Sequence, residues 1–310
     1  MIKTAESVTP KHPDKICDQI SDAILDECLR QDPDSRVAVE VMGGHGIITV
    51  TGELTTKAYV DIPSIVREVY GDIGVQTNII QQSPDIAKGV DWGGAGDQGI
   101  MVGYACNENE AMIPQELYLA RKLAQDIYRR YPVDGKTQVT IENGKVKTVV
   151  ASFCNVFTED LISIIRESCP DATILANPAG HWTQGGFDAD TGVTGRKLAV
   201  DNYGPQIPIG GGAFSGKDYT KVDRTGAYYA RRLAVEYLRE TGAKEVFIKL
   251  AFAIGVEKPI MITVNVDGKE IEHPNVLTVK QMVELLDLKK PIYRETAKWG
   301  HFGSGFKWDR

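Results

Sequence analysis

The sequence contains few cysteines, no closely spaced cysteine pair and no long apolar run. Its five cysteines are scattered and odd in number, which argues against a disulfide framework or a zinc site and predicts reduced thiols, most of them buried. No apolar stretch is long enough to span a bilayer, and no signal peptide opens the chain. We therefore expect a cytoplasmic protein.

Positive charge is also scarce, with 35 Lys and Arg against 42 Asp and Glu and a net charge of −7 over 310 residues. This balance argues against binding to nucleic acid or to a membrane surface. The histidines lack metal-ligand spacing and no Gly-x-Ser-x-Gly motif occurs, so neither a histidine metal centre nor a Ser-His-Asp hydrolase is predicted. An anionic substrate would need local clusters of Lys and Arg, and such clusters are present.

The run GGGAFSGKD at residues 210–218 is the most informative feature that is present. Consecutive glycines let the backbone approach a bulky ligand, and Ser215 and Lys217 add a hydroxyl and a cation, which together suit a polyphosphate. Residues 211–217 nearly match a P-loop, but Asp218 follows where a P-loop has the Ser or Thr that holds magnesium. The run therefore predicts phosphate binding without predicting an ordinary P-loop NTPase.

A second motif, KHPDK at residues 11–15, begins a predicted helix. A helix N-terminus attracts phosphate, so His12 could donate to a developing anion while Asp14 could ligate Mg²⁺. The alternative is that Asp14 and Lys15 are surface residues. The same combination of cations and a carboxylate recurs where another predicted helix begins, at Lys217, Lys221 and Asp223.

Two loops combine small residues with charged ones. In GGAGDQG at residues 93–99, Asp97 could receive a ribose or an amino group, unless the segment is a plain turn. In residues 188–197, Arg196 and Lys197 suit a phosphate chain, unless the segment is a solvated loop with surface ion pairs.

The local patterns alternate between helix and hairpin. Apolar residues from Ile16 to Cys28 recur every four positions and predict a helix over residues 13–29. Hairpins are predicted at residues 36–54, 137–152 and 245–266, each between two predicted helices. This recurrence predicts an α+β fold of three similar domains, at residues 1–90, 91–184 and 185–310. The first helix also carries an acidic stripe at the same spacing: Asp14, Asp18 and Asp22.

Several motifs together resemble those of one known family. They are ESVTPKHPDKICDQISD at 6–22, QSPDI at 82–86, GAGDQG at 94–99, TGRK at 194–197, GGGAFSGKD at 210–218, KVDR at 221–224, AIGV at 253–256 and PIYRETAKWGHFG at 291–303. Over essentially its whole length the chain resembles the S-adenosylmethionine synthetases. The resemblance implies three similar α+β domains, with active sites between two subunits of a homodimer or tetramer.

The resemblance also implies the reaction. The sulfur of methionine attacks C5′ of the ribose of ATP and displaces tripolyphosphate, which is then hydrolysed to pyrophosphate and phosphate. Two Mg²⁺ and one K⁺ are implied as cofactors. A sulfur nucleophile loses no proton, so the absence of a base–nucleophile pair fits this chemistry.

Carried onto matching positions, the resemblance implies roles for single residues. His12 supports the departing triphosphate oxygen, and the other catalytic residues are Lys136, Arg196 and Lys217. ATP and its phosphates are contacted by His12, Asp134, Lys136, His181, Trp182, Asp190, Arg196, Lys197, Ala213 and Lys217. Methionine is contacted by Glu53, Gln82, Asp97, Asp190 and Lys221. Asp14 and Asp223 match Mg²⁺ ligands, whereas Glu40 and the neighbouring Ser215 form the K⁺ site.

The chain departs from the family pattern in four places. Lys11 replaces a glycine, Gly135 replaces an alanine, and His181–Trp182 replaces an Arg-Phe pair, which removes a cation from the nucleotide site. The segment between Gln82 and Gly94, where the family has a mobile lid, is short. These departures predict a compact member that leaks tripolyphosphate. Two alternatives stay open: a different ATP-dependent phosphotransferase, and an ATP-binding member with impaired catalysis.

Overall fold

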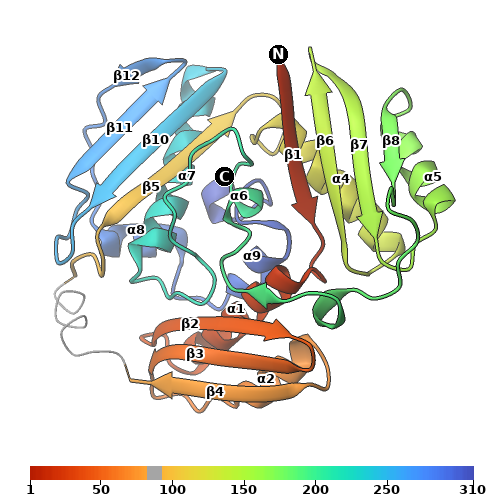
Figure 1. Cartoon of the computed structure of the whole chain (residues 1–310). Helices are drawn as coiled ribbons and strands as arrows, with labels where there is room; N and C mark the ends of the chain where they lie inside the picture. Colours follow the sequence, from red (N-terminus) through yellow and green to blue (C-terminus); the bar gives the residue numbers. More distant parts are fainter. Residues whose placement is uncertain (82–92) are drawn as a thin grey trace.

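The computed structural model describes residues 1–81 and 93–310. Figure 1 shows three four-stranded sheets arranged around a central group of helices. The predicted lid lies largely outside the described residues, and so does Gln82. Within the described part of the chain, no helix combines the length and the apolar character that crossing a membrane requires.

The first sheet has the strand order β4-β3-β2-β9 and lies at the bottom of Figure 1. Val37, Val39 and Val41 of β2 point into the core while Glu40 is exposed, so the alternation of side chains sets which face is buried. Helices α1 and α2 belong to this unit. The bounds are β2 Arg36–Gly44, β3 Ile47–Thr55, β4 Gly74–Ile80, β9 Gly192–Val193, α1 Pro13–Gln31 and α2 Ile62–Val69.

The second sheet has the order β1-β6-β7-β8 and lies at the right of Figure 1. Asn143 and Gly144, both with positive φ, turn the β6–β7 hairpin as a two-residue Asn-Gly turn should. The bounds are β1 Ile2–Val8, β6 Gly135–Glu142, β7 Lys145–Phe153, β8 Thr173–Ala176, α4 Gln115–Arg130 and α5 Thr158–Ser168.

The third sheet has the order β12-β11-β10-β5 and lies at the left of Figure 1. Its helices are the long, largely buried α7 and the shorter α8. A capping box formed by Thr278 and Gln281 marks the start of α8. The bounds are β5 Gly99–Cys106, β10 Glu245–Phe252, β11 Met261–Val266, β12 Lys269–Ile271, α7 Val222–Thr241 and α8 Val279–Leu286.

The three units repeat one plan, which confirms the predicted α+β fold of three similar domains. In each, a helix precedes an antiparallel hairpin, and a strand from elsewhere in the chain borders the hairpin's first strand. These bordering strands are β9 in the first sheet, β1 in the second and β5 in the third. β1 joins the second sheet and β5 the third, so the sheets include strands from both sides of residues 90 and 184. The domain boundaries at these two residues therefore stay a prediction.

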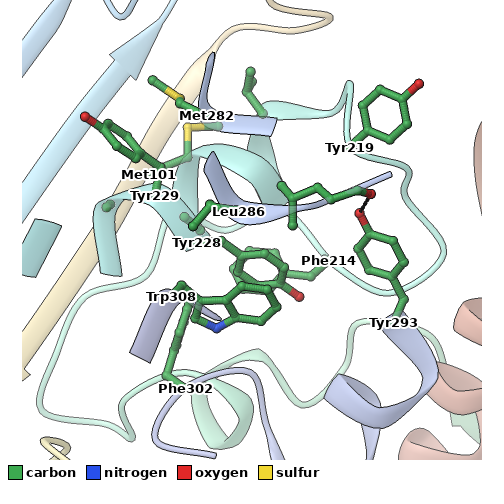
Figure 2. Packing of buried hydrophobic residues seen from close by; sticks show 14 of the residues in the cluster. Met101, Phe214, Tyr219, Tyr228, Tyr229, Met282, Leu286, Tyr293, Phe302 and Trp308 are labelled. Carbon is green, nitrogen blue, oxygen red and sulfur yellow. Dashed lines mark hydrogen bonds between the residues drawn. The ribbon is translucent and has the colours of Figure 1, made fainter. Parts of the chain in front are cut away.

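The C-terminal part of the chain fills the space between the units. Trp308 is buried and stacks on Tyr228 of α7, with ring centroids 3.8 Å apart, and Figure 2 shows Phe214 and Phe302 beside this pair. Helix α9, Tyr293–Trp299, packs near α1, and the short α6 is Leu198–Asp201. All five cysteines are buried and free, as predicted.

Candidate active site

The N-terminus of α1 is capped by His12, whose Nδ1 accepts the Asp14 N–H at 3.2 Å. When Nδ1 accepts, the proton of the neutral ring is on Nε2. Burial, together with the charge of Lys197, lowers the pKa of His12 to about 4, so the ring is neutral at pH 7. His12 can therefore donate one hydrogen bond from Nε2 to an anion at this helix end.

Asp14 connects α1 to the segment that follows β9. Its Oδ1 accepts the Val193 N–H at 3.0 Å and lies 2.9 Å from Arg196 Nε, while Oδ2 contacts Lys197 Nζ. Burial opposes ionisation, but the hydrogen bonds from Lys197 and Val193 outweigh it and lower the pKa of Asp14. Asp14 and Lys15 are both buried, so the alternative that they are surface residues is wrong.

The glycine-rich segment 210–218 runs antiparallel to β2. The Val39 N–H bonds the Gly216 carbonyl at 3.1 Å, and Ala38 pairs with Lys217. Glu40 and Ser215, the two residues expected to hold K⁺, come next along the two segments, and their K⁺ site stays a prediction. Gly216 has φ +82°, and a Cβ there would lie 1.9 Å from the Val39 carbonyl oxygen, so only glycine fits.

Phe214 anchors the same segment to the core. Its ring meets those of His301 and Tyr228 edge-on, with centroid distances of 4.9 and 5.8 Å, and Figure 2 shows Phe214 beside Tyr228. Its carbonyl accepts the Arg224 Nη1 hydrogen at 2.9 Å. The loop expected to bind phosphate is thus held to the core by a buried aromatic residue at its centre.

Lys217 and Lys221 each pair with a carboxylate where α7 begins. Lys217 Nζ lies 2.6 Å from Asp223 Oδ2, and Lys221 Nζ lies 2.6 Å from Asp218 Oδ2. A Cβ on Gly212 would lie 2.2 Å from the Asp223 carboxyl group, so the glycine run packs directly against this carboxylate. Lys217, which is expected to bind phosphate, is therefore paired with Asp223, which is expected to bind Mg²⁺.

A third group lies at the edge of the second sheet. Asp134, just before β6, accepts the Gly186 N–H at 2.8 Å, and burial raises the pKa of its carboxyl group. Lys136 is exposed on β6, 3.8 Å from Glu6 of β1. Lys136 and the exposed Asp190 are both expected to contact the nucleotide, and these contacts stay a prediction.

His181 and Trp182 lie farther along the connection from β8. His181 is exposed and stacks on Phe157 at 5.2 Å, and Trp182 Nε1 donates to Asn177 at 3.3 Å. Neither contact involves the cations described above. Their binding to the nucleotide stays a prediction.

The residues expected to contact methionine are more dispersed. Glu53 and Glu40 lie on the outer face of the β2–β3 hairpin and line, with residues of β4, a cavity of about 410 Å³. Asp97 is exposed on the loop before β5, whereas Gln82 lies outside the described residues. The contacts of these residues with methionine stay a prediction.

The acidic stripe of α1 contains two residues, to which the sequence assigned no role, that hold loops of the candidate site. Asp18 Oδ1 accepts the Gly195 N–H and Asp22 Oδ1 accepts the Gly216 N–H, both at 2.8 Å. Both carboxylates are buried. The regular spacing of the stripe, on a helix that also carries an apolar face, could have indicated this role. A carboxylate that such a helix buries needs hydrogen-bond partners from elsewhere in the chain.

The arrangement defines a nucleotide-binding enzyme: glycine-rich loops carry cations and carboxylates beside two helix N-termini, as a metal-bound polyphosphate requires. Comparison with known proteins is consistent with this class. Three family models match, for the N-terminal domain of S-adenosylmethionine synthetase at residues 1–88, its central domain at 92–178 and its C-terminal domain at 184–310. The chain belongs to the S-adenosylmethionine synthetase family.

Two relatives match over the full length. The S-adenosylmethionine synthase of Petrotoga mobilis (strain DSM 10674 / SJ95) is 41% identical over 385 aligned positions, covering 100% of this chain and 96% of the relative. That of Desulforudis audaxviator (strain MP104C) is 42% identical over 378 positions, covering 99% and 95%. Because 385 positions are aligned with 310 residues, at least 75 positions of the first relative have no residue opposite them here.

Proposed function

We propose that this chain makes S-adenosylmethionine from ATP and L-methionine by attack of the sulfur on ribose C5′ and displacement of tripolyphosphate. It then hydrolyses the tripolyphosphate to pyrophosphate and phosphate. The observation that carries the proposal is the pairing of Asp14, on α1, with Lys197 and of Asp223, on α7, with Lys217. Membership of the family over the whole chain supports the same reaction.

The chemistry requires positioning and charge stabilisation rather than a base, because the attacking sulfur loses no proton. Neutral His12 donates a hydrogen bond to the departing triphosphate oxygen. Lys136, Arg196 and Lys217 balance the negative charge that develops on the leaving group. The remaining nucleotide contacts come from Asp134, His181, Trp182, Asp190, Lys197 and Ala213, and those to methionine from Glu53, Gln82, Asp97, Asp190 and Lys221.

Members of this family generally use Mg²⁺ and K⁺. Asp14 and Asp223 suit Mg²⁺, which is usually held by one or two carboxylates together with substrate phosphates. They would hold the two Mg²⁺, and Glu40 with Ser215 would hold K⁺. Bound Mg²⁺ would supply positive charge that stabilises the departing tripolyphosphate.

The proposed enzyme is compact, and its short lid lets part of the tripolyphosphate escape before hydrolysis. The positions of the relative that have no counterpart in this chain support a reduced molecule. A transferase that releases all tripolyphosphate unhydrolysed, or an ATP-binding member with impaired catalysis, is the alternative. The retained pairs of carboxylates and cations favour an active enzyme.

A homodimer is the smallest assembly proposed, with a tetramer as the alternative. Met42, Ile80 and Ile100 lie on strands of two different sheets, and each is more than half exposed, which leaves apolar surface for a second subunit to cover. Light scattering coupled to size-exclusion chromatography should give a mass of at least twice the 34.0 kDa chain. A monomer that is fully active would contradict a shared site.

The test of the function is an assay with ATP, L-methionine, Mg²⁺ and K⁺, read by mass spectrometry and phosphorus NMR. S-adenosylmethionine with pyrophosphate, phosphate and some free tripolyphosphate is expected. Pyrophosphate and phosphate alone would contradict the leak, whereas tripolyphosphate alone would show that the hydrolysis step is absent. ADP or AMP would indicate a phosphotransferase, and ATP binding without S-adenosylmethionine would indicate the impaired member.

A further inference from the structure

Lys15 is a buried cation that the sequence motif placed beside the proposed Mg²⁺ ligand without giving it a role. Its side chain is 1% exposed, and its Nζ donates to Asp201 Oδ2 at 2.7 Å and to Asp18 Oδ2 at 3.1 Å. Asp18 and Asp201 are buried as well. An ammonium group takes this position only where its contacts compensate the loss of water, so the three side chains form one interdependent unit.

The two carboxylates lie at the two ends of one short segment. Asp18 Oδ1 accepts the Gly195 N–H at 2.8 Å, and the Asp201 N–H bonds the Lys197 carbonyl at 2.9 Å. Arg196 and Lys197 lie between these anchors. Lys15 therefore connects the start and the end of the segment that carries both cations to the first turns of α1.

A neighbouring contact supports a rigid segment. Thr194 Oγ1 lies 2.6 Å from Ser21 Oγ and accepts the Val41 N–H at 2.9 Å. Gly195 follows with φ +77°, and a Cβ there would lie 2.4 Å from the Ala213 side chain of the other glycine-rich loop. The backbone that leads into Arg196 is thus fixed on several sides, while the Arg196 side chain itself is half exposed.

We propose that Lys15, by bridging Asp18 and Asp201, is the positioning residue that sets Arg196 and Lys197 for the polyphosphate. The inference rests on the proposed function, because it takes Arg196 and Lys197 as phosphate ligands. Lys15 itself contacts no substrate. It acts through the backbone at Gly195 and through α6.

Asp26 supplies a matched control on the same helix. It is buried, and its two oxygens accept the N–H groups of Tyr293 and Arg294, both at 2.9 Å, which begin α9 rather than a ligand loop. Asp18→Ala and Asp26→Ala therefore each remove a buried carboxylate from α1. Only Asp18→Ala removes a contact with the segment that carries Arg196 and Lys197.

The experiment measures tripolyphosphate binding by calorimetry, without methionine, and the kcat and KM of the transfer reaction. We expect Lys15→Met and Asp18→Ala to weaken tripolyphosphate binding and kcat about tenfold to a hundredfold, with the KM for methionine nearly unchanged. Asp26→Ala should lower the melting temperature while leaving tripolyphosphate binding within about twofold of wild type. If Lys15→Met fails to fold, the isosteric Asp18→Asn provides the measurement.

The proposal is overturned if folded Lys15→Met or Asp18→Asn binds tripolyphosphate like wild type, or if Asp26→Ala loses as much affinity. A wild-type protein that binds tripolyphosphate but forms no S-adenosylmethionine would contradict the proposed function and leave the binding comparison valid. The two proposals can therefore fail separately.

Discussion

Asp22 and Arg224 form a two-point ion pair between α1 and α7, with Nη1–Oδ1 at 2.7 Å and Nη2–Oδ2 at 2.8 Å. Both side chains are almost completely buried. Asp22 also accepts the Gly216 N–H, and Arg224 donates to the Phe214 carbonyl. One ion pair therefore joins two helices from opposite halves of the chain and holds the glycine-rich loop between them.

Breaking this pair on one side should be severely destabilising. Arg224→Met leaves the Asp22 carboxylate buried without its cation, which should lower the free energy of unfolding by about 3–5 kcal/mol in urea titrations. The double variant Asp22→Asn with Arg224→Met should recover part of this loss, because no unpaired charge remains. Additive losses in the double variant would show that the two side chains do not act as a pair.

The ion pairs of the site predict opposite effects on metal and polyphosphate. Lys217→Ala frees the Asp223 carboxylate, so the affinity for free Mn²⁺, a spectroscopic probe for Mg²⁺, should rise about two- to tenfold. The affinity for tripolyphosphate should fall, since a cation is lost. Lys221→Ala is the control, because it removes an equal charge from Asp218 instead. Equal changes in Mn²⁺ affinity in both variants would contradict the assignment of Asp223.

Substitutions at two adjacent glycines should have opposite effects on stability and on ligand binding. Gly211 has φ +99° with open space around it, so Gly211→Ala should cost about 1–2 kcal/mol of stability through backbone strain and leave ligand binding intact. At Gly212 an added methyl would displace the Asp223 carboxyl group, the movable end of a side chain. Gly212→Ala should keep its melting temperature and lose Mn²⁺ and tripolyphosphate binding. The reverse pattern would mean that Gly212 serves the fold alone.

Asp26 predicts a pH dependence of stability. Burial raises the pKa of Asp26 to about 6, against the effect of its two amide hydrogen bonds, whereas the unfolded value is 3.8. The folded state therefore binds more protons between these values, so the unfolding free energy of wild type, relative to Asp26→Asn, should rise as pH falls from 7 to 4. The expected gain is about 1–3 kcal/mol. A difference that stays constant with pH would show an ordinary pKa at this site.

Several features were predictable because they depend on residues close together in the sequence. The four-residue apolar period of α1, the Asn-Gly turn between β6 and β7, and the glycine run at residues 210–218 each express a local preference of the backbone. Their recurrence was enough to predict three α+β units. The motifs also indicated the family, which full-length relatives then showed.

Tertiary structure decided what those features contact. β1 and β5 lack a local signal that names their partners, and they pair with β6 and β10 because each hairpin exposes an unpaired edge. The stripe of Asp14, Asp18 and Asp22 was visible in the sequence, but its targets lie far along the chain. Sequence alone determined the helix that carries these carboxylates. Only folding, by burying them where loop amides and cations could compensate the lost water, decided that they hold the loops of the candidate site.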